Sequence, residues 1–266
     1  MEPVELIFFA AMISLAVLGW LAFGYAYKLG FRPFGPQRNR AVPWPGRDLV
    51  LLAPMVIAGI LRGLLSDEKL EDHAAFAGLT MLAIVSVLVL PFHVLVVRGA
   101  RLYQLGLHVS HFRRNALVGF GTFWLSAPLV AVTNLLALQF FERRAHSIEQ
   151  AIRESPTLTN FLLSGIGAIL IAPFIEELTF RGILQPWLSR ALGRVPGICL
   201  SSAIFAVAHA DAWPAPLALF VFAIFLGYLA NRTSSLVGSI VLHATFNAAN
   251  MMILALAVYF GELPPM

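Results

Sequence analysis

Long runs of apolar residues, separated by short polar or proline-containing stretches, make up most of the chain. A helix needs about 20 apolar residues to cross a bilayer. We expect such helices over residues 5–27, 48–65, 74–97, 116–140, 158–180, 197–213, 214–231 and 235–259. The pattern therefore predicts an all-α fold, a polytopic bundle of about eight transmembrane helices.

The connections between these runs have distinct characters. Residues 28–47 are rich in Pro, Gly and Arg, which is typical of a linker rather than a helix. Residues 141–157 have the composition of a polar helix at the membrane surface, which should end before Pro156. The stretch Trp213-Pro214-Ala215-Pro216 divides one apolar region into two short helices.

The composition places the protein in a membrane. Hydrophobic residues make up 59% of the chain and charged residues 12%, against about 45–50% and about 25% in soluble domains. Basic residues gather in alternate connections, so the positive-inside rule puts the linker 28–47 in the cytoplasm and both termini outside. We expect a multi-pass protein of the cell inner (plasma) membrane with lipid around it. No nucleic-acid motif accompanies the net charge of +4, so no nucleic-acid partner is expected.

Three polar groups interrupt the apolar runs of the C-terminal half. The first contains Glu176, Glu177 and Arg181. Glu177 and Arg181 are four residues apart and can form an ion pair on one helix face. Glu176 points about 100° away and is left without a local partner, as a general base or a metal ligand would be. Packing between helices, or a substrate pathway, is the alternative reading of these charges.

The other two groups each contain a histidine. Phe205 and His209 share a helix face, and so do His243 and Asn247. An imidazole and an amide at this spacing can both donate to one oxyanion, although polar packing between helices would use the same residues. The rise of 1.5 Å per residue puts all three groups at comparable depth. We therefore expect one shared buried site.

These motifs resemble those of the CAAX protease and bacteriocin-processing family (CPBP, or Abi), which includes the type II CAAX prenyl endopeptidases. The family pattern reads here as Glu176-Glu177-x-x-x-Arg181, Phe205-x-x-x-His209 and His243-x-x-x-Asn247. The resemblance covers residues 160–255. It implies a catalytic helix bundle over 158–259, and the apolar runs before it predict an N-terminal transmembrane region over 1–150.

The resemblance implies an intramembrane endopeptidase with Glu176, His209, His243 and Asn247 as catalytic residues. Glu176 and His209 would activate a water, and His243 and Asn247 would stabilise the oxyanion. Glu177, Arg181 and Phe205 would support them. Glu176, His209 and His243 could also supply a zinc site, as in a metalloprotease, although we favour a metal-free glutamate mechanism because His243 and Asn247 suit an oxyanion hole.

The resemblance leaves the substrate class open. It implies a peptide or membrane-protein substrate, prenylated if the protein carries out CAAX-type C-terminal processing and otherwise a peptide to be matured. The alternative is a non-enzymatic membrane protein. In a transporter the buried Glu and His residues would relay protons, whereas a toxin-immunity scaffold would keep only the fold.

Overall fold

The computed structural model describes residues 40, 42–64, 73–145 and 147–260, with single residues and short stretches between 14 and 28. All regular elements in these residues are helices, which confirms the all-α class. Most of the predicted span 5–27 and most of the linker 28–47 lie outside the described residues.

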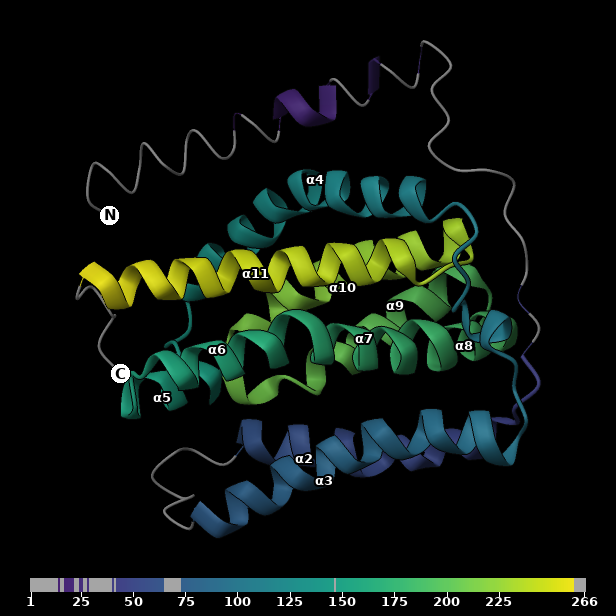
Figure 1. Ribbon diagram of the computed structural model, residues 1–266, viewed down its shortest axis with the longest axis horizontal. Helices are drawn as coiled ribbons and strands as arrows, with labels where there is room; N and C mark the ends of the chain where they lie inside the picture. The colour runs from purple at the N-terminus through teal and green to yellow at the C-terminus, as the bar shows by residue number, and fades with distance from the viewer. Residues whose placement is uncertain are drawn as a thin grey trace.

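The first described helices form a pair at one edge of the molecule (Figure 1). The elements are η1 (Gly46–Leu52), α2 (Ala53–Leu64), α3 (His73–Phe92) and the π-helical turn η3 (His93–Val97). The predicted span 48–65 thus begins as a 3₁₀ turn and continues as an α-helix of 12 residues. Prolines explain this start, because Pro45 precedes η1 and Pro54 lies in the first turn of α2.

The middle of the chain forms a short 3₁₀ turn, one long helix and one short helix. It contains η4 (Leu102–Leu105), α4 (Phe112–Leu138) and α5 (Ser147–Glu154). The short helix α5 is the polar helix expected within 141–157, and it ends before Pro156 as predicted.

A single continuous helix of 35 residues, Leu158–Leu192, follows. It is built from α6 (Leu158–Ile166), η5 (Gly167–Ile171), α7 (Ala172–Glu177), η6 (Leu178–Leu184) and α8 (Gln185–Leu192). The helix runs beyond residue 180, where the prediction ended it, because Arg181 and Gln185 are buried inside the protein. Two π-helical segments, η5 and η6, flank the turn that carries Glu176 and Glu177.

Three helices complete the bundle. They are α9 (Arg194–Val207), α10 (Ala215–Thr233) and α11 (Val237–Phe260), with the 3₁₀ turn η7 (Ala210–Ala212) between the first two. The predicted break at Trp213–Pro216 is confirmed. In Figure 1, α10 and α11 lie between α4 and the continuous helix, and α9 packs on α8 and α10.

The outer surface of the bundle is apolar, as lipid contact requires. Large apolar side chains are exposed on several helices, among them Leu82, Leu117, Leu170 and Ile253. Five described stretches are long and apolar enough to cross a membrane: Ala77–Val97, Phe112–Leu138, Leu158–Leu192, Ala215–Thr233 and Val237–Phe260. The protein is therefore an integral membrane protein with a helical bundle fold.

Candidate active site

The site is centred on a buried ion pair in the middle of the continuous helix. Glu177 and Arg181 both have 0% of their surface exposed, and Arg181 Nη1 lies 3.1 Å from Glu177 Oε1. Arg181 Nη2 also donates to the carbonyl of Ala223 in α10, at 3.3 Å. The pairing expected from the four-residue spacing is confirmed. It neutralises two charges that would be costly to bury separately.

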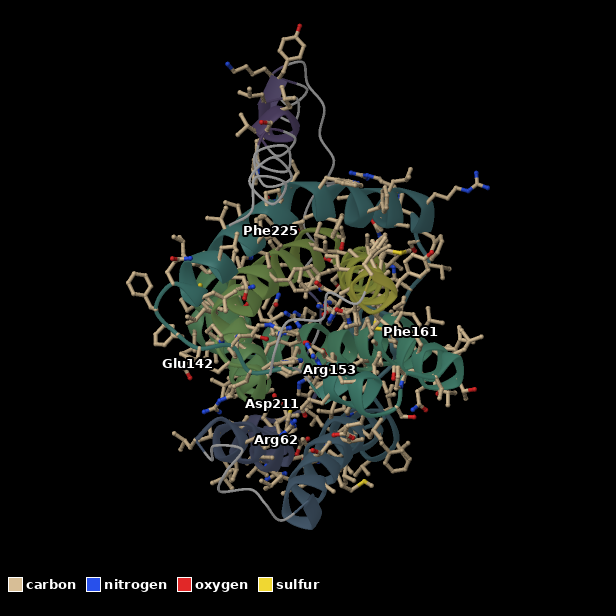
Figure 2. The ribbon with its side chains drawn as sticks, turned by 90° about the vertical axis from the view of Figure 1, so that its left-hand side faces the viewer. Arg62, Glu142, Arg153, Phe161, Asp211 and Phe225 are labelled. Atoms are coloured by element: carbon tan, nitrogen blue, oxygen red, sulfur yellow. The ribbon has the colours of Figure 1, made fainter. Side chains whose placement is uncertain are left out.

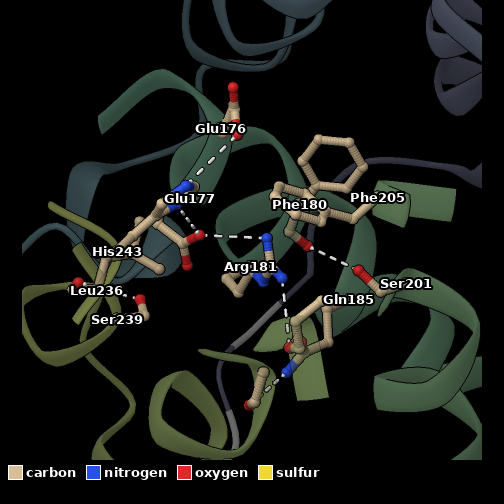
Figure 3. A network of polar contacts seen from close by, with 12 residues as sticks. Glu176, Glu177, Phe180, Arg181, Gln185, Ser201, Phe205, Leu236, Ser239 and His243 are labelled. Atoms are coloured by element: carbon tan, nitrogen blue, oxygen red, sulfur yellow. Dashed lines mark hydrogen bonds and ion pairs between the residues drawn. The ribbon is translucent and has the colours of Figure 1, made fainter. Parts of the chain in front are cut away.

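His243 joins this pair from α11. Its Nδ1 lies 3.1 Å from Oε1 of Glu177, and its Nε2 lies 3.8 Å from Oε2 of Glu176 (Figure 3). The carboxylate of Glu177 can only accept, so Nδ1 carries the proton and Nε2 faces Glu176. Glu177 thus orients His243, one of the four residues that the resemblance implied it would support.

Glu176 differs from its neighbour in exposure and partners. Its side chain is 21% exposed, and its Oε2 atom is buried without a hydrogen-bond partner among the described residues. The separation of 3.8 Å from His243 is too long for a direct hydrogen bond. A carboxylate oxygen that is shielded but uncommitted is suited to accept a proton from a bound water.

Phe205 connects the two histidines. Its ring lies 4.7 Å from that of His209 and 5.8 Å from that of His243, measured between centroids. The guanidinium carbon of Arg181 lies 4.5 Å from the centre of the same ring. Phe205 therefore packs against both histidines and the central ion pair at once.

His209 follows the end of α9 and has a defined tautomer. Its Nδ1 lies 2.8 Å from the carbonyl of Phe205. A carbonyl can only accept, so Nδ1 is the protonated nitrogen and Nε2 of the neutral ring is an acceptor. An acceptor at this position is consistent with the predicted role of binding a water.

The backbone that carries His209 is packed directly against α2. A Cβ added at Gly59 would come within 2.5 Å of the carbonyl oxygen of Val207, and one at Gly63 within 2.8 Å of the Cβ of Ala210. Between these glycines, Arg62 forms an ion pair with Asp211 (Figure 2). The helix α2 thus packs directly against residues 207–210, which include His209.

Asn247 lies one turn beyond His243 on α11. Its Nδ2 donates to the carbonyl of Ala168 in the π-helical segment η5, at 2.7 Å. The amide keeps its second N–H for another acceptor. The structure therefore shows Asn247 as a link between α11 and the continuous helix, and its role towards an oxyanion stays a prediction.

The residues proposed as zinc ligands do not form a ligand cluster. In the part of the chain that the structure describes, no group of three His, Cys, Asp or Glu side chains lies close enough to hold a metal ion. Nδ1 of His243 is occupied by Glu177, and Nδ1 of His209 by a carbonyl. These bonds leave Nε2 of each ring available, as it would be for a bound water or a metal ion. The choice between a zinc site and a metal-free glutamate site therefore stays a prediction.

Two polar partners of this site, Gln185 and Arg40, were not predicted from the sequence. Gln185 continues the spacing of Glu177 and Arg181 by another four residues, and it donates to the carbonyl of Gly227 at 2.9 Å. That periodicity could have identified it. Arg40 donates to the carbonyl of Arg181 at 2.7 Å, but its position in the linker gave no signal, because spacing along a helix says nothing about distant segments.

Comparison with known proteins finds a family match for the region that carries the predicted catalytic residues. Residues 158–249 match the family described as Rce1-like, type II CAAX prenyl endopeptidase. No curated protein and no solved structure matches the chain. The matched region includes all of the predicted catalytic residues and excludes α2, α3 and α4.

Proposed function

We propose that the protein is a glutamate-dependent intramembrane endopeptidase, because residues 158–249 match the family of Rce1-like type II CAAX prenyl endopeptidases. Its substrate would be a peptide or protein at the membrane. We favour CAAX-type processing of a prenylated C-terminus, with peptide maturation as the second class.

The observation that supports this proposal most strongly is the arrangement of Glu176 beside His243. An uncommitted carboxylate oxygen lies 3.8 Å from an imidazole nitrogen whose orientation a buried carboxylate fixes. Glu176 takes a proton from the attacking water, which His209 Nε2 helps to hold. The water oxygen then bonds to the carbonyl carbon of the substrate.

The same residues can stabilise the tetrahedral intermediate by donating hydrogen bonds to its oxyanion. His243, when Nε2 also carries a proton, donates to the developing oxyanion, and the second N–H of Asn247 is the other donor. Glu176 returns its proton to the leaving amine as the C–N bond breaks. A preorganised donor of this kind contributes a factor of about 10²–10³ to the rate.

The test is cleavage of a prenylated CAAX-type reporter peptide by the purified protein in detergent. We expect cleavage by wild type and none by Glu176→Gln, which keeps the shape of the side chain but cannot act as a base. Glu142→Gln is a suitable control, because Glu142 is exposed on the connection after α4. Full activity of Glu176→Gln would exclude the mechanism.

A chelator distinguishes the two chemical classes in the same assay. Cleavage that persists with a zinc chelator supports the glutamate mechanism, and cleavage lost with the chelator supports a metalloprotease. If wild type cleaves neither a prenylated nor an unprenylated peptide, the non-enzymatic alternative gains support.

A further inference from the structure

One backbone carbonyl of the site lacks the donor that the π-helical hydrogen-bond pattern would give it. In the π-helical segment η6, the N–H of Gln185 donates to the carbonyl of Phe180, five residues earlier. The next carbonyl is that of Arg181, and the same pattern would pair it with residue 186. Residue 186 is a proline and has no N–H.

Arg40 supplies the missing donor from outside the matched region. Its Nη2 donates to the carbonyl of Arg181 at 2.7 Å, across 141 positions of sequence. The guanidinium fits closely against Gly106, where an added Cβ would come within 2.3 Å of Arg40 Nη1. This contact joins the segment before η1 to the centre of the continuous helix.

Removing the charged guanidinium of Arg40 from water costs free energy, which its contacts must offset. Burial lowers the pKa of Arg40 to about 10, and Nη1 has no hydrogen-bond partner among the described residues. An apolar side chain could fill this volume without desolvating a charge. The bond to Arg181 is the interaction that an apolar side chain could not make.

We propose that Arg40 is a positioning residue of the active site, acting through Arg181 on Glu177 and His243. The path consists of three short contacts: Arg40 to the Arg181 carbonyl at 2.7 Å, Arg181 to Glu177 at 3.1 Å, and Glu177 to His243 at 3.1 Å. The proposal rests on the proposed endopeptidase function, because it treats His243 as catalytic.

The proline suggests a specific test by second-site rescue. Arg40→Met should lower kcat for the reporter peptide by about 10- to 100-fold, because small misplacements of catalytic groups have effects of this size. KM should stay unchanged. In Arg40→Met/Pro186→Ala, the new N–H of residue 186 can donate to the Arg181 carbonyl, so most of the lost kcat should return.

Arg190→Met is the matched control. Arg190 donates to the carbonyl of Val42, two residues after Arg40, at 3.0 Å. This bond connects the segment before η1 to α8 and not to η6. This variant removes an equivalent arginine contact and should keep the kcat of wild type. A similar loss in Arg190→Met, or no rescue by Pro186→Ala, would show that Arg40 only supports the fold and would overturn the proposal.

Hydrogen–deuterium exchange provides a measurement that does not depend on catalysis. Amides of residues 178–185 should exchange faster in Arg40→Met and return towards wild-type rates in the double variant. Unchanged exchange in Arg40→Met would overturn the proposal. A wild-type protein that cleaves no peptide would instead contradict the proposed function, and the exchange result would still decide the role of Arg40.

Discussion

Glu177 is the residue on which the polar centre depends, since its Oε1 atom contacts both Arg181 and His243. Removal of one partner from a buried pair leaves the other charge unpaired in a medium of low dielectric constant. The structural role and the proposed role in orienting His243 therefore overlap at this position, and single substitutions cannot separate them.

A pair of substitutions can separate these roles. Arg181→Ala should lower the free energy of unfolding by about 3–5 kcal/mol, because it strands the buried Glu177 carboxylate. Glu177→Gln/Arg181→Met removes both charges and should recover much of the melting temperature in detergent. Its cleavage activity should stay low, because His243 no longer has a carboxylate acceptor. Recovery of activity together with stability would contradict this role of Glu177.

At the residue scale, the sequence predicted contacts within one helix better than contacts between helices. The spacing of Glu177 and Arg181 was enough to predict their pairing. One shared site was expected, but the spacing could not predict that His243 would bond to Glu177 within it. Helical spacing fixes which residues share a face, but the rotation of that face towards another helix depends on packing along its whole length.

Among the elements, α2 packs closely against the segment that carries His209. Gly59 and Gly63 allow its backbone to lie against residues 207–210, and the pair Arg62–Asp211 joins the two segments. The pair is partly shielded, with side-chain exposures of 8% and 14%. Its contribution should lie between the values for exposed and buried pairs.

A charge exchange tests this pair. Arg62→Ala should lower the free energy of unfolding by about 2 kcal/mol, between about 1 kcal/mol for exposed pairs and about 3–5 kcal/mol for buried ones. Arg62→Asp should be more harmful than Arg62→Ala, and Arg62→Asp/Asp211→Arg should recover the melting temperature. Arg153→Ala is a control in which the carboxylate, Glu149 in α5, keeps a second arginine partner, Arg143.

Prolines explain which elements the sequence could predict. The end of α5 before Pro156 and the break at Trp213–Pro216 were predicted, because a proline restricts its own backbone and that of the residue before it. The extent of the continuous helix was not. The prediction ended the span at residue 180 because polar residues follow it. Arg181 and Gln185 are instead buried against other helices, so the helix continues past them.

On the scale of the whole molecule, an ion pair ties the N-terminal segment to the connection between α3 and α4. Asp48 in η1 accepts from Nε and Nη2 of Arg98, both at 2.6 Å. The hydrogen bonds from Arg98 hold the pKa of Asp48 below its usual value, against the opposing effect of burial. The carboxylate form is therefore favoured in the folded protein.

This shift predicts how stability depends on pH. A carboxyl whose pKa is lowered by folding contributes its full stability above the unfolded pKa of about 4, and loses it as the pH falls through the lower folded value. Melting temperatures in detergent from about pH 7 to about pH 3 should therefore fall less steeply for Asp48→Asn than for wild type. Parallel curves for the two proteins would show that Asp48 has no part in the acid sensitivity.

The continuous helix has a consequence for the lipid around it. Its 35 residues extend over about 52 Å, whereas the hydrocarbon layer of a bilayer is about 30 Å thick. Such a helix must tilt or project, and the balance depends on the length of the lipid acyl chains. Glu176 stands near the middle of this helix. Under the proposed endopeptidase function, bilayer thickness would therefore help to set the depth at which its carboxylate meets a peptide bond. Membranes of different thickness would then select different cleavage positions in one and the same substrate.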